Sequence, residues 1–128
     1  MNAIRQCAMV LMASELAFPV LASALDECVR IGDAAAVLRC LNEEEGKANA
    51  DLSSAESVAA KRARALEQAT GRAGAYAALA KSVRDFAAYR ASQCAFIKEA
   101  MASGSGGAEA QVGCRIDLNR RRVRELKF

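Results

Sequence analysis

The sequence contains no histidine and no tryptophan, and its single proline, Pro19, lies near the N-terminus. Histidine is the usual general base of active sites and the commonest metal ligand, so its absence argues against many enzymes and metal proteins. Aromatic residues make up only 5% of the chain, and alanine supplies much of its apolar content. No run of eighteen uninterrupted apolar residues occurs, so a membrane span is not indicated.

The chain also lacks the residue patterns of metal, phosphate and catalytic sites. Its four cysteines after residue 24 contain no CxxC pair and are 12, 54 and 20 residues apart, unlike zinc ligands. The glycine-rich residues 103–107 have neither a lysine nor a preceding strand, which disfavours phosphate binding. The consecutive carboxylates Glu43, Glu44 and Glu45 point in different directions on a helix, which disfavours acid–base catalysis. We therefore expect no enzyme, no metal and no cofactor.

The first 24 residues differ from the rest of the chain. Arg5 is their only basic residue, and a mostly apolar run over residues 7–24 ends in the tripeptide Ala-Ser-Ala. Such a segment is typical of a secretory signal peptide, although Glu15 interrupts its apolar part. We predict a signal peptide at residues 1–24 and one periplasmic or secreted domain at residues 25–128, with a buried N-terminal helix as the alternative.

Cysteine number fits this interpretation. The predicted domain keeps four of the five cysteines, namely Cys28, Cys40, Cys94 and Cys114. An even number behind a signal peptide indicates two disulfides, for which three pairings exist. A domain of this size buries only about two thirds of its unfolded surface, so cross-links are useful to it. Each bridge is worth roughly 3 kcal/mol in the chain-entropy description.

Apolar residues recur every three or four positions over most of the chain, which predicts helices, and no strand pattern appears. Asp33 is a suitable N-cap for a first helix that ends near Thr70, with a candidate bend at Gly46. Further helices are predicted at residues 76–101 and 108–126, after a short helical or irregular lead-in. The predicted fold is all-α, an antiparallel three-helix assembly built on a long helical hairpin and stapled by two disulfides.

The glycine-rich turn predicts one of the disulfides. Cys94 lies nine residues before Ser103, and Cys114 lies seven residues after Gly107. At about 1.5 Å per helical residue, both cysteines are at a similar distance from the turn in an antiparallel pair. We therefore favour Cys94–Cys114, which leaves Cys28 to pair with Cys40.

One charged residue falls on an apolar helix face. Arg90 lies between Phe86 and Cys94 at helical spacing. A guanidinium there must be paired or extend its charged end to water. We predict a structural ion pair between Arg90 and Asp51 of the first helix, with contact to a ligand as the alternative.

The charge is unevenly distributed. Residues 26–56 hold eight acidic and three basic residues, whereas residues 115–128 hold six basic and two acidic residues. Solvated helix faces that attract each other weakly are the simplest interpretation. Two docking surfaces of opposite sign are the alternative. The basic run at residues 120–124 has no interleaved aromatics, which argues against nucleic acid, and an anionic polymer or lipid headgroup would suit it better.

Several segments together resemble the lysozyme inhibitor LprI-like family of small helical proteins of the bacterial envelope. They are Cys40 with the ANADLS run at residues 48–53, the FAAYRASQCAF segment at residues 86–96, the glycine turn at residues 104–107, and Cys114 with Leu118, Arg122 and Leu126. The resemblance covers about residues 28–126. Phe86, Ser53 and Asn119 stand where the family usually has Trp, Asn and Thr, which bears on binding specificity more than on fold.

The resemblance implies an extracytoplasmic helical protein without enzymatic activity, and lysozyme inhibition is described for some members. The first hypothesis is therefore a protein that binds and inhibits a lysozyme. The acidic residues Glu43, Glu44 and Glu45 would attract the enzyme, and Ser105 and Gly106 of the turn would enter its cleft. The second is a structural or scaffolding envelope protein that binds another protein or an anionic surface. A cytosolic redox-sensing protein is a third, if the N-terminal segment is retained.

Overall fold

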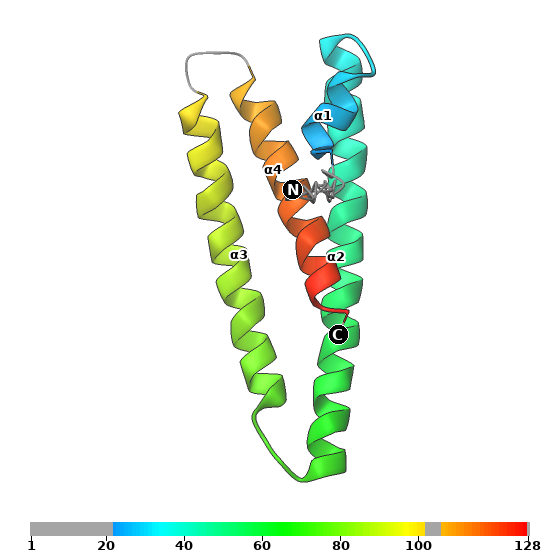
Figure 1. The fold of residues 1–128 in the computed structure, drawn as a ribbon, viewed down its shortest axis with the longest axis vertical. Helices are drawn as coiled ribbons and strands as arrows, with labels where there is room; N and C mark the ends of the chain where they lie inside the picture. Colours follow the sequence, from blue (N-terminus) through cyan, green and yellow to red (C-terminus); the bar gives the residue numbers. More distant parts are fainter. Residues whose placement is uncertain (1–21, 102–105, 128) are drawn as a thin grey trace, which may run out of the picture.

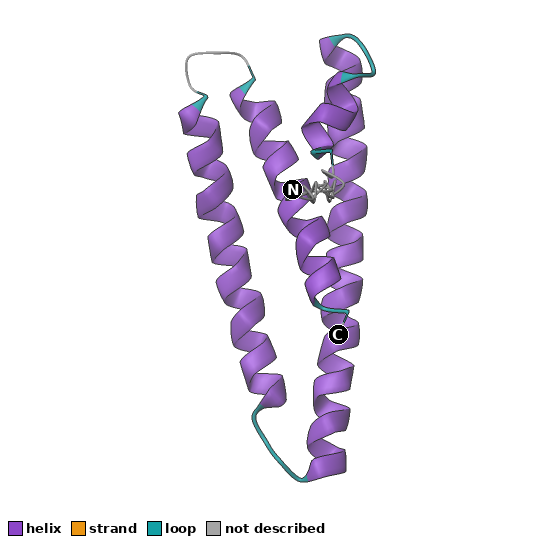
Figure 2. Cartoon of the chain, in the orientation of Figure 1, coloured by secondary structure: helices purple, strands orange, loops and turns teal. Residues whose placement is uncertain are grey.

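The computed structural model of the chain describes residues 22–101 and 106–127. Four helices make up this part: α1 (Ala24–Val29), α2 (Ala34–Thr70), α3 (Ala75–Ala100) and α4 (Gly107–Glu125). Figure 2 shows that the regular structure of this part is helical, and no strand occurs in the described ranges. The all-α prediction is confirmed. The lead-in is a short fourth helix, and α2 continues through Gly46 as one helix of 37 residues.

The helices pack as a long hairpin filled by a third helix. α2 and α3 form the two long arms, and α4 lies against both of them (Figure 1). The short α1 packs against α2 and α4 near the end of the bundle that carries the α3–α4 connection. Because α4 has 19 residues and α2 has 37, α4 ends well before the α2–α3 connection.

Local chemistry explains where the two arms begin and end. The Asp33 side chain accepts a hydrogen bond from the Ala36 N–H at 2.9 Å, which confirms this N-cap. Gly71 closes α2 in the left-handed conformation at φ 66°. The Glu67 carboxylate then accepts from the N–H groups of Gly74 and Tyr76, each at 2.9 Å, at the start of α3. These bonds, that from Tyr76 above all, lower the pKa of Glu67 against the effect of desolvation.

The core is small and rich in alanine. One cluster of buried residues lies among α1, α2 and α4, and comprises Ala24, Cys28, Val37, Leu41, Ala48 and Ile116. A second lies further along the hairpin and comprises Leu52, Ala59 and Leu126, with Phe86 and Leu79 of α3 packed against it. Alanine contributes little buried area, so cross-links and polar contacts carry an unusual share of the stability.

Glycine allows one close approach that positions α1. A Cβ added at Gly113 in α4 would come within 3.0 Å of the Leu25 Cβ. Gly113 lies buried within α4. The missing side chain lets α1 lie directly on α4, which brings the N-terminal part of the domain into the first core cluster.

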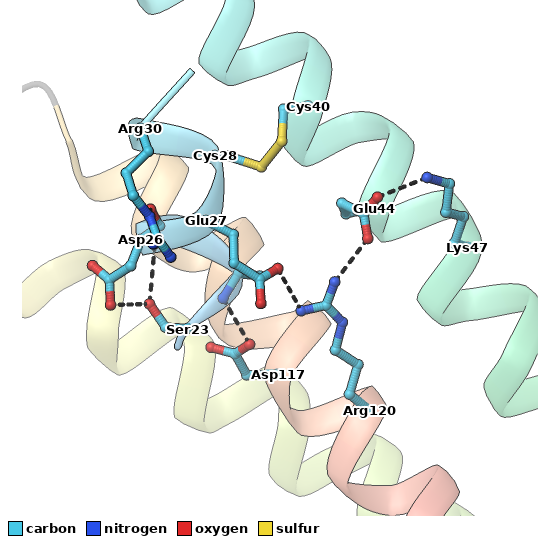
Figure 3. Close-up of a disulfide and its surroundings, with 11 residues drawn as sticks. Ser23, Asp26, Glu27, Cys28, Arg30, Cys40, Glu44, Lys47, Asp117 and Arg120 are labelled. Carbon is cyan, nitrogen blue, oxygen red and sulfur yellow. Dashed lines mark hydrogen bonds and ion pairs between the residues drawn. A yellow bond between two sulfur atoms is a disulfide. The ribbon is translucent and has the colours of Figure 1, made fainter. Parts of the chain in front are cut away.

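Both predicted disulfides are present. Cys28 is bonded to Cys40 and ties α1 to α2, and Figure 3 shows this bridge. Cys94 is bonded to Cys114 and ties α3 to α4, with a Cα–Cα distance of 5.6 Å. The pairing inferred from the symmetric placement about the glycine-rich turn is therefore confirmed.

Candidate partner-binding surface

The acidic residues proposed to attract a partner are mostly engaged inside the bundle. Arg120 of α4 donates to Glu27 of α1 at 3.0 Å and to Glu44 of α2 at 2.7 Å, as Figure 3 shows. One guanidinium thus joins three helices. Lys47, 2.7 Å from Glu44, lowers the pKa of that carboxyl together with Arg120, although burial opposes the shift.

The neighbouring carboxylates lie in different surroundings. Arg115 of α4 donates to Glu45 at 2.5 Å, and the Glu45 side chain is 22% exposed. Glu43 faces solvent. The three acids therefore do not form one surface, because consecutive helix positions diverge. Two of them hold α2 to α4, which leaves Glu43 as the member accessible to a partner.

Arg90 has a different partner from the one predicted. It donates from Nη1 to the Asn119 side-chain oxygen at 2.6 Å, and Asn119 donates to the Asn49 side-chain oxygen at 2.8 Å. Asn119 is fully buried, and this chain of hydrogen bonds joins all three long helices. The described ion pairs include none between Arg90 and Asp51.

The rotation of α2 about its axis explains why Asp51 is not the partner of Arg90. Asp51 is exposed and lines a groove together with Val123 and Lys127. The residues of this groove come from α2 and from the end of α4. No residue of α3 takes part in that groove. Asn49, two positions earlier, is the residue that faces the Asn119 side chain. A shift of two helical positions turns a side chain by about 200°, so the two could not share a partner.

The basic run near the C-terminus is divided between the interior and the solvent. Arg120 pairs with acids, as described above, and Arg122 donates to the Ser82 hydroxyl of α3 at 2.6 Å. Arg122 also lies over the Phe86 ring, 5.5 Å from its centre. Arg121 and Arg124 are exposed. The basic run therefore does not form one solvated face, because Arg120 and Arg122 are engaged between helices.

Two large apolar side chains remain exposed near the end of α3. Phe96 is 63% exposed and Met101 is 45% exposed, and five helical positions separate them, so they project from different sides of the helix. Gly106, at the N-cap position of α4, is half-buried, whereas Ser105 lies outside the described residues. The sequence offered the signal for Phe96, because it is two positions from Cys94 and so lies off the buried stripe.

The described ranges contain no cluster of three or more residues suited to hold a metal ion. Within the same ranges, every helix is too short or too polar to cross a membrane. The structure therefore brings polar and charged side chains together in hydrogen bonds and ion pairs between helices. Among the exposed large apolar side chains of the described ranges, Phe96 has the largest exposed fraction.

Comparison with known families gives a match. The family model described as "Lysozyme inhibitor LprI" matches residues 28–126, which is most of the chain. No match was found among curated proteins or among solved structures. The matched range starts at Cys28 and includes both disulfides, the three long helices and Asn119.

Proposed function

The chain belongs to the lysozyme inhibitor LprI family, and on this basis we propose that it is an extracytoplasmic, non-enzymatic protein that binds and inhibits a lysozyme. The observation that carries the proposal is the family match across the whole disulfide-bonded bundle. Two disulfides suit an oxidising compartment outside the cytoplasm, where a lysozyme would be met.

The surface that we assign to the lysozyme is the part of α3 that exposes Phe96, together with Gly106 at the start of α4. Exposed aromatic and methionine side chains are enriched at the centres of protein interfaces. A lysozyme-type active site places two carboxylates in a cleft, which an inhibitor can fill without catalysing anything. The Cys94–Cys114 bridge holds both helix ends in place and so reduces the entropy lost on binding.

Inhibition should therefore depend on Phe96. We expect Phe96→Ser to raise the concentration of protein needed for half inhibition of a lysozyme by about tenfold or more, because an aromatic anchor is lost. The matched control is Leu66→Ser, which removes a 55% exposed apolar side chain from α2 near the opposite end. Equal inhibition by Phe96→Ser and unaltered protein would reject this surface.

Glu43 supplies a second, electrostatic contribution to the same proposal. It is the exposed member of its acidic trio and can speed the approach of a basic lysozyme at low salt. Charge reversal of Glu43 alone leaves the ion pairs of Glu44 and Glu45 intact. The variant thus separates attraction of the enzyme from stability of the bundle.

Export requires a cleaved leader, and the surroundings of α1 favour a cut two residues earlier than the sequence pattern suggested. Ala24 is fully buried in the first core cluster, and its N–H donates to the Asp117 carboxylate at 3.0 Å. The Ser23 hydroxyl caps α1 by accepting from the Asp26 N–H at 3.1 Å. A cut after Ala24 would remove the cap and a core residue, whereas a cut after the exposed Ala22 removes neither.

We therefore expect N-terminal sequencing of the exported protein to begin at Ser23. Ala22 supplies the small residue that a signal peptidase needs before the cut. Ala22→Gln should block processing without disturbing the fold, because Ala22 is exposed. A mature chain that begins at Leu25, or one that retains Met1, would contradict the proposed boundary.

A further inference from the structure

A groove of about 530 Å³ opens between α2 and α3, where α4 comes to its end. Its walls are alanine and leucine side chains from both arms of the hairpin, namely Ala59, Ala63, Leu66, Ala75, Ala78 and Leu79. The volume lies within the range of ligand sites, and the space between helices of a bundle is a frequent place for them. Neither the disulfides nor Phe96 takes part in it.

Two arginines and one hydroxyl are the polar groups of this groove. Arg62 lines it from α2, and Arg122 and Ser82 line it where α4 meets α3. Arg122 is 14% exposed; its Nη2 donates to Ser82, and its Nη1 is 3.5 Å from the half-exposed Glu125 carboxylate. Its Nε is buried without a hydrogen-bond partner. A largely buried guanidinium with one distant carboxylate attracts a further anion.

The surrounding charge has the same sign. Residues 61–84 contain six basic residues and a single acidic one, Glu67. The Glu67 carboxylate already accepts two backbone hydrogen bonds at the start of α3. The exposed Arg121, Arg124 and Lys127 add positive charge at the end of α4. The apolar groove is thus placed in a positive field, unlike the acidic half of α2 that carries residues 43–45.

We propose that this groove binds one single-chain anionic amphiphile, whose hydrocarbon chain lies along the alanine and leucine walls and whose acidic headgroup contacts Arg122 and Arg62. The apolar walls suit the hydrocarbon chain of the ligand, and the positive charge of the arginines suits its acidic headgroup. Alanine at most wall positions leaves room for a slender chain rather than a bulky ring. The proposal is independent of lysozyme inhibition, because the groove is on the part of the hairpin away from Phe96.

Calorimetric titration of the oxidised protein with decanoate, below the concentration at which it forms micelles, tests the proposal. We expect saturable binding of one decanoate per chain. Decyltrimethylammonium has the same chain and the opposite charge, and we expect it to bind at least about tenfold more weakly. Acetate, which has the charge without the chain, should show no measurable binding.

Two neighbouring exposed alanines of α3 provide a matched pair of variants. Ala78 lines the groove and Ala77 does not, and both are exposed. Ala78→Trp should abolish decanoate binding by filling the groove, whereas Ala77→Trp should bind as the unaltered protein does. Arg122→Gln should weaken binding about tenfold and reduce the preference for the anion. Because the alanine variants leave Arg122 in place, they keep the test valid if Arg122→Gln is unstable.

Several results would overturn the proposal. They are no binding of decanoate, equal binding of both charges, or equal binding by the two tryptophan variants. Sedimentation can give two further results of this kind. A dimer that Ala78→Trp abolishes would assign the groove to a second copy of the chain. Binding to anionic phospholipid vesicles that is the same in both variants, without uptake of decanoate, would assign the basic residues to a membrane surface.

Discussion

Replacement of Cys94 and Cys114 by alanine is expected to lower the free energy of unfolding by about 3 kcal/mol. The bridge closes a loop between residues 20 positions apart, and its loss returns the corresponding entropy to the unfolded chain. Small domains have a total stability of only about 5 to 15 kcal/mol, so the loss would be a large part of it. The alanine-rich core offers little to compensate.

Urea unfolding followed by circular dichroism at helix wavelengths measures this effect. The informative control is the pair Cys28→Ala and Cys40→Ala, because that bridge ties the short α1 to α2 and closes a loop between residues 12 positions apart. We expect its removal to cost somewhat less, since the smaller loop releases less entropy. Unfolding midpoints that do not change when the Cys94–Cys114 bridge is removed would show that packing alone holds α3 against α4.

Asn119→Ala is expected to lower the free energy of unfolding by about 3 kcal/mol. The substitution removes two hydrogen bonds and takes the Asn119 acceptor away from the half-buried Arg90 guanidinium, whereas the exposed Asn49 can bond to water. A buried polar group without a partner costs more than the hydrogen bond itself contributes. Because Asn119 joins α2, α3 and α4, its loss affects every long helix.

The control for this substitution is Asn42→Ala on the exposed face of α2, which should stay within about 0.5 kcal/mol of the unaltered protein. A double-mutant cycle of Arg90→Ala and Asn119→Ala should show coupling, whereas Arg90→Ala and Asp51→Ala should be additive. Coupling of Arg90 to Asp51 instead of Asn119 would contradict the observed hydrogen-bond arrangement.

These two predictions also show what the sequence could and could not reveal. Helix positions follow from local periodicity, and Asp33 caps α2 because capping involves only nearby backbone groups. The Cys94–Cys114 bridge could be inferred because two helices that leave one short turn keep equal distances from it. Membership of the family could likewise be recognised from residue order over residues 28–126.

Contacts between helices could not be inferred in the same way. The partner of Arg90 depends on how α2 and α4 are rotated about their axes, and sequence spacing does not fix that rotation. Asp51 and Asn49 are both within reach along the chain, but only Asn49 faces Asn119. The same uncertainty applied to Glu44 and Glu45, whose ion pairs with Arg120 and Arg115 depend on the placement of α4.

The groove between α2 and α3 also could not be predicted from the sequence. Its existence depends on the difference in length between α4 and the two arms, and on alanine at the facing positions. Alanine favours helix formation wherever it occurs, so its presence does not distinguish a packed seam from an open one. Only the position at which α4 ends shows which alanines remain uncovered.

Inhibition of a lysozyme by the oxidised chain from Ser23 to Phe128 is the measurement that tests the proposed function most directly. The same protein, reduced and alkylated, provides the comparison, because it keeps the sequence and loses both bridges. We predict inhibition that rises with the concentration of oxidised protein and is lost on reduction. Absence of inhibition by the oxidised chain across several lysozyme types would contradict the proposed function, and inhibition that survives reduction would contradict its dependence on the folded bundle.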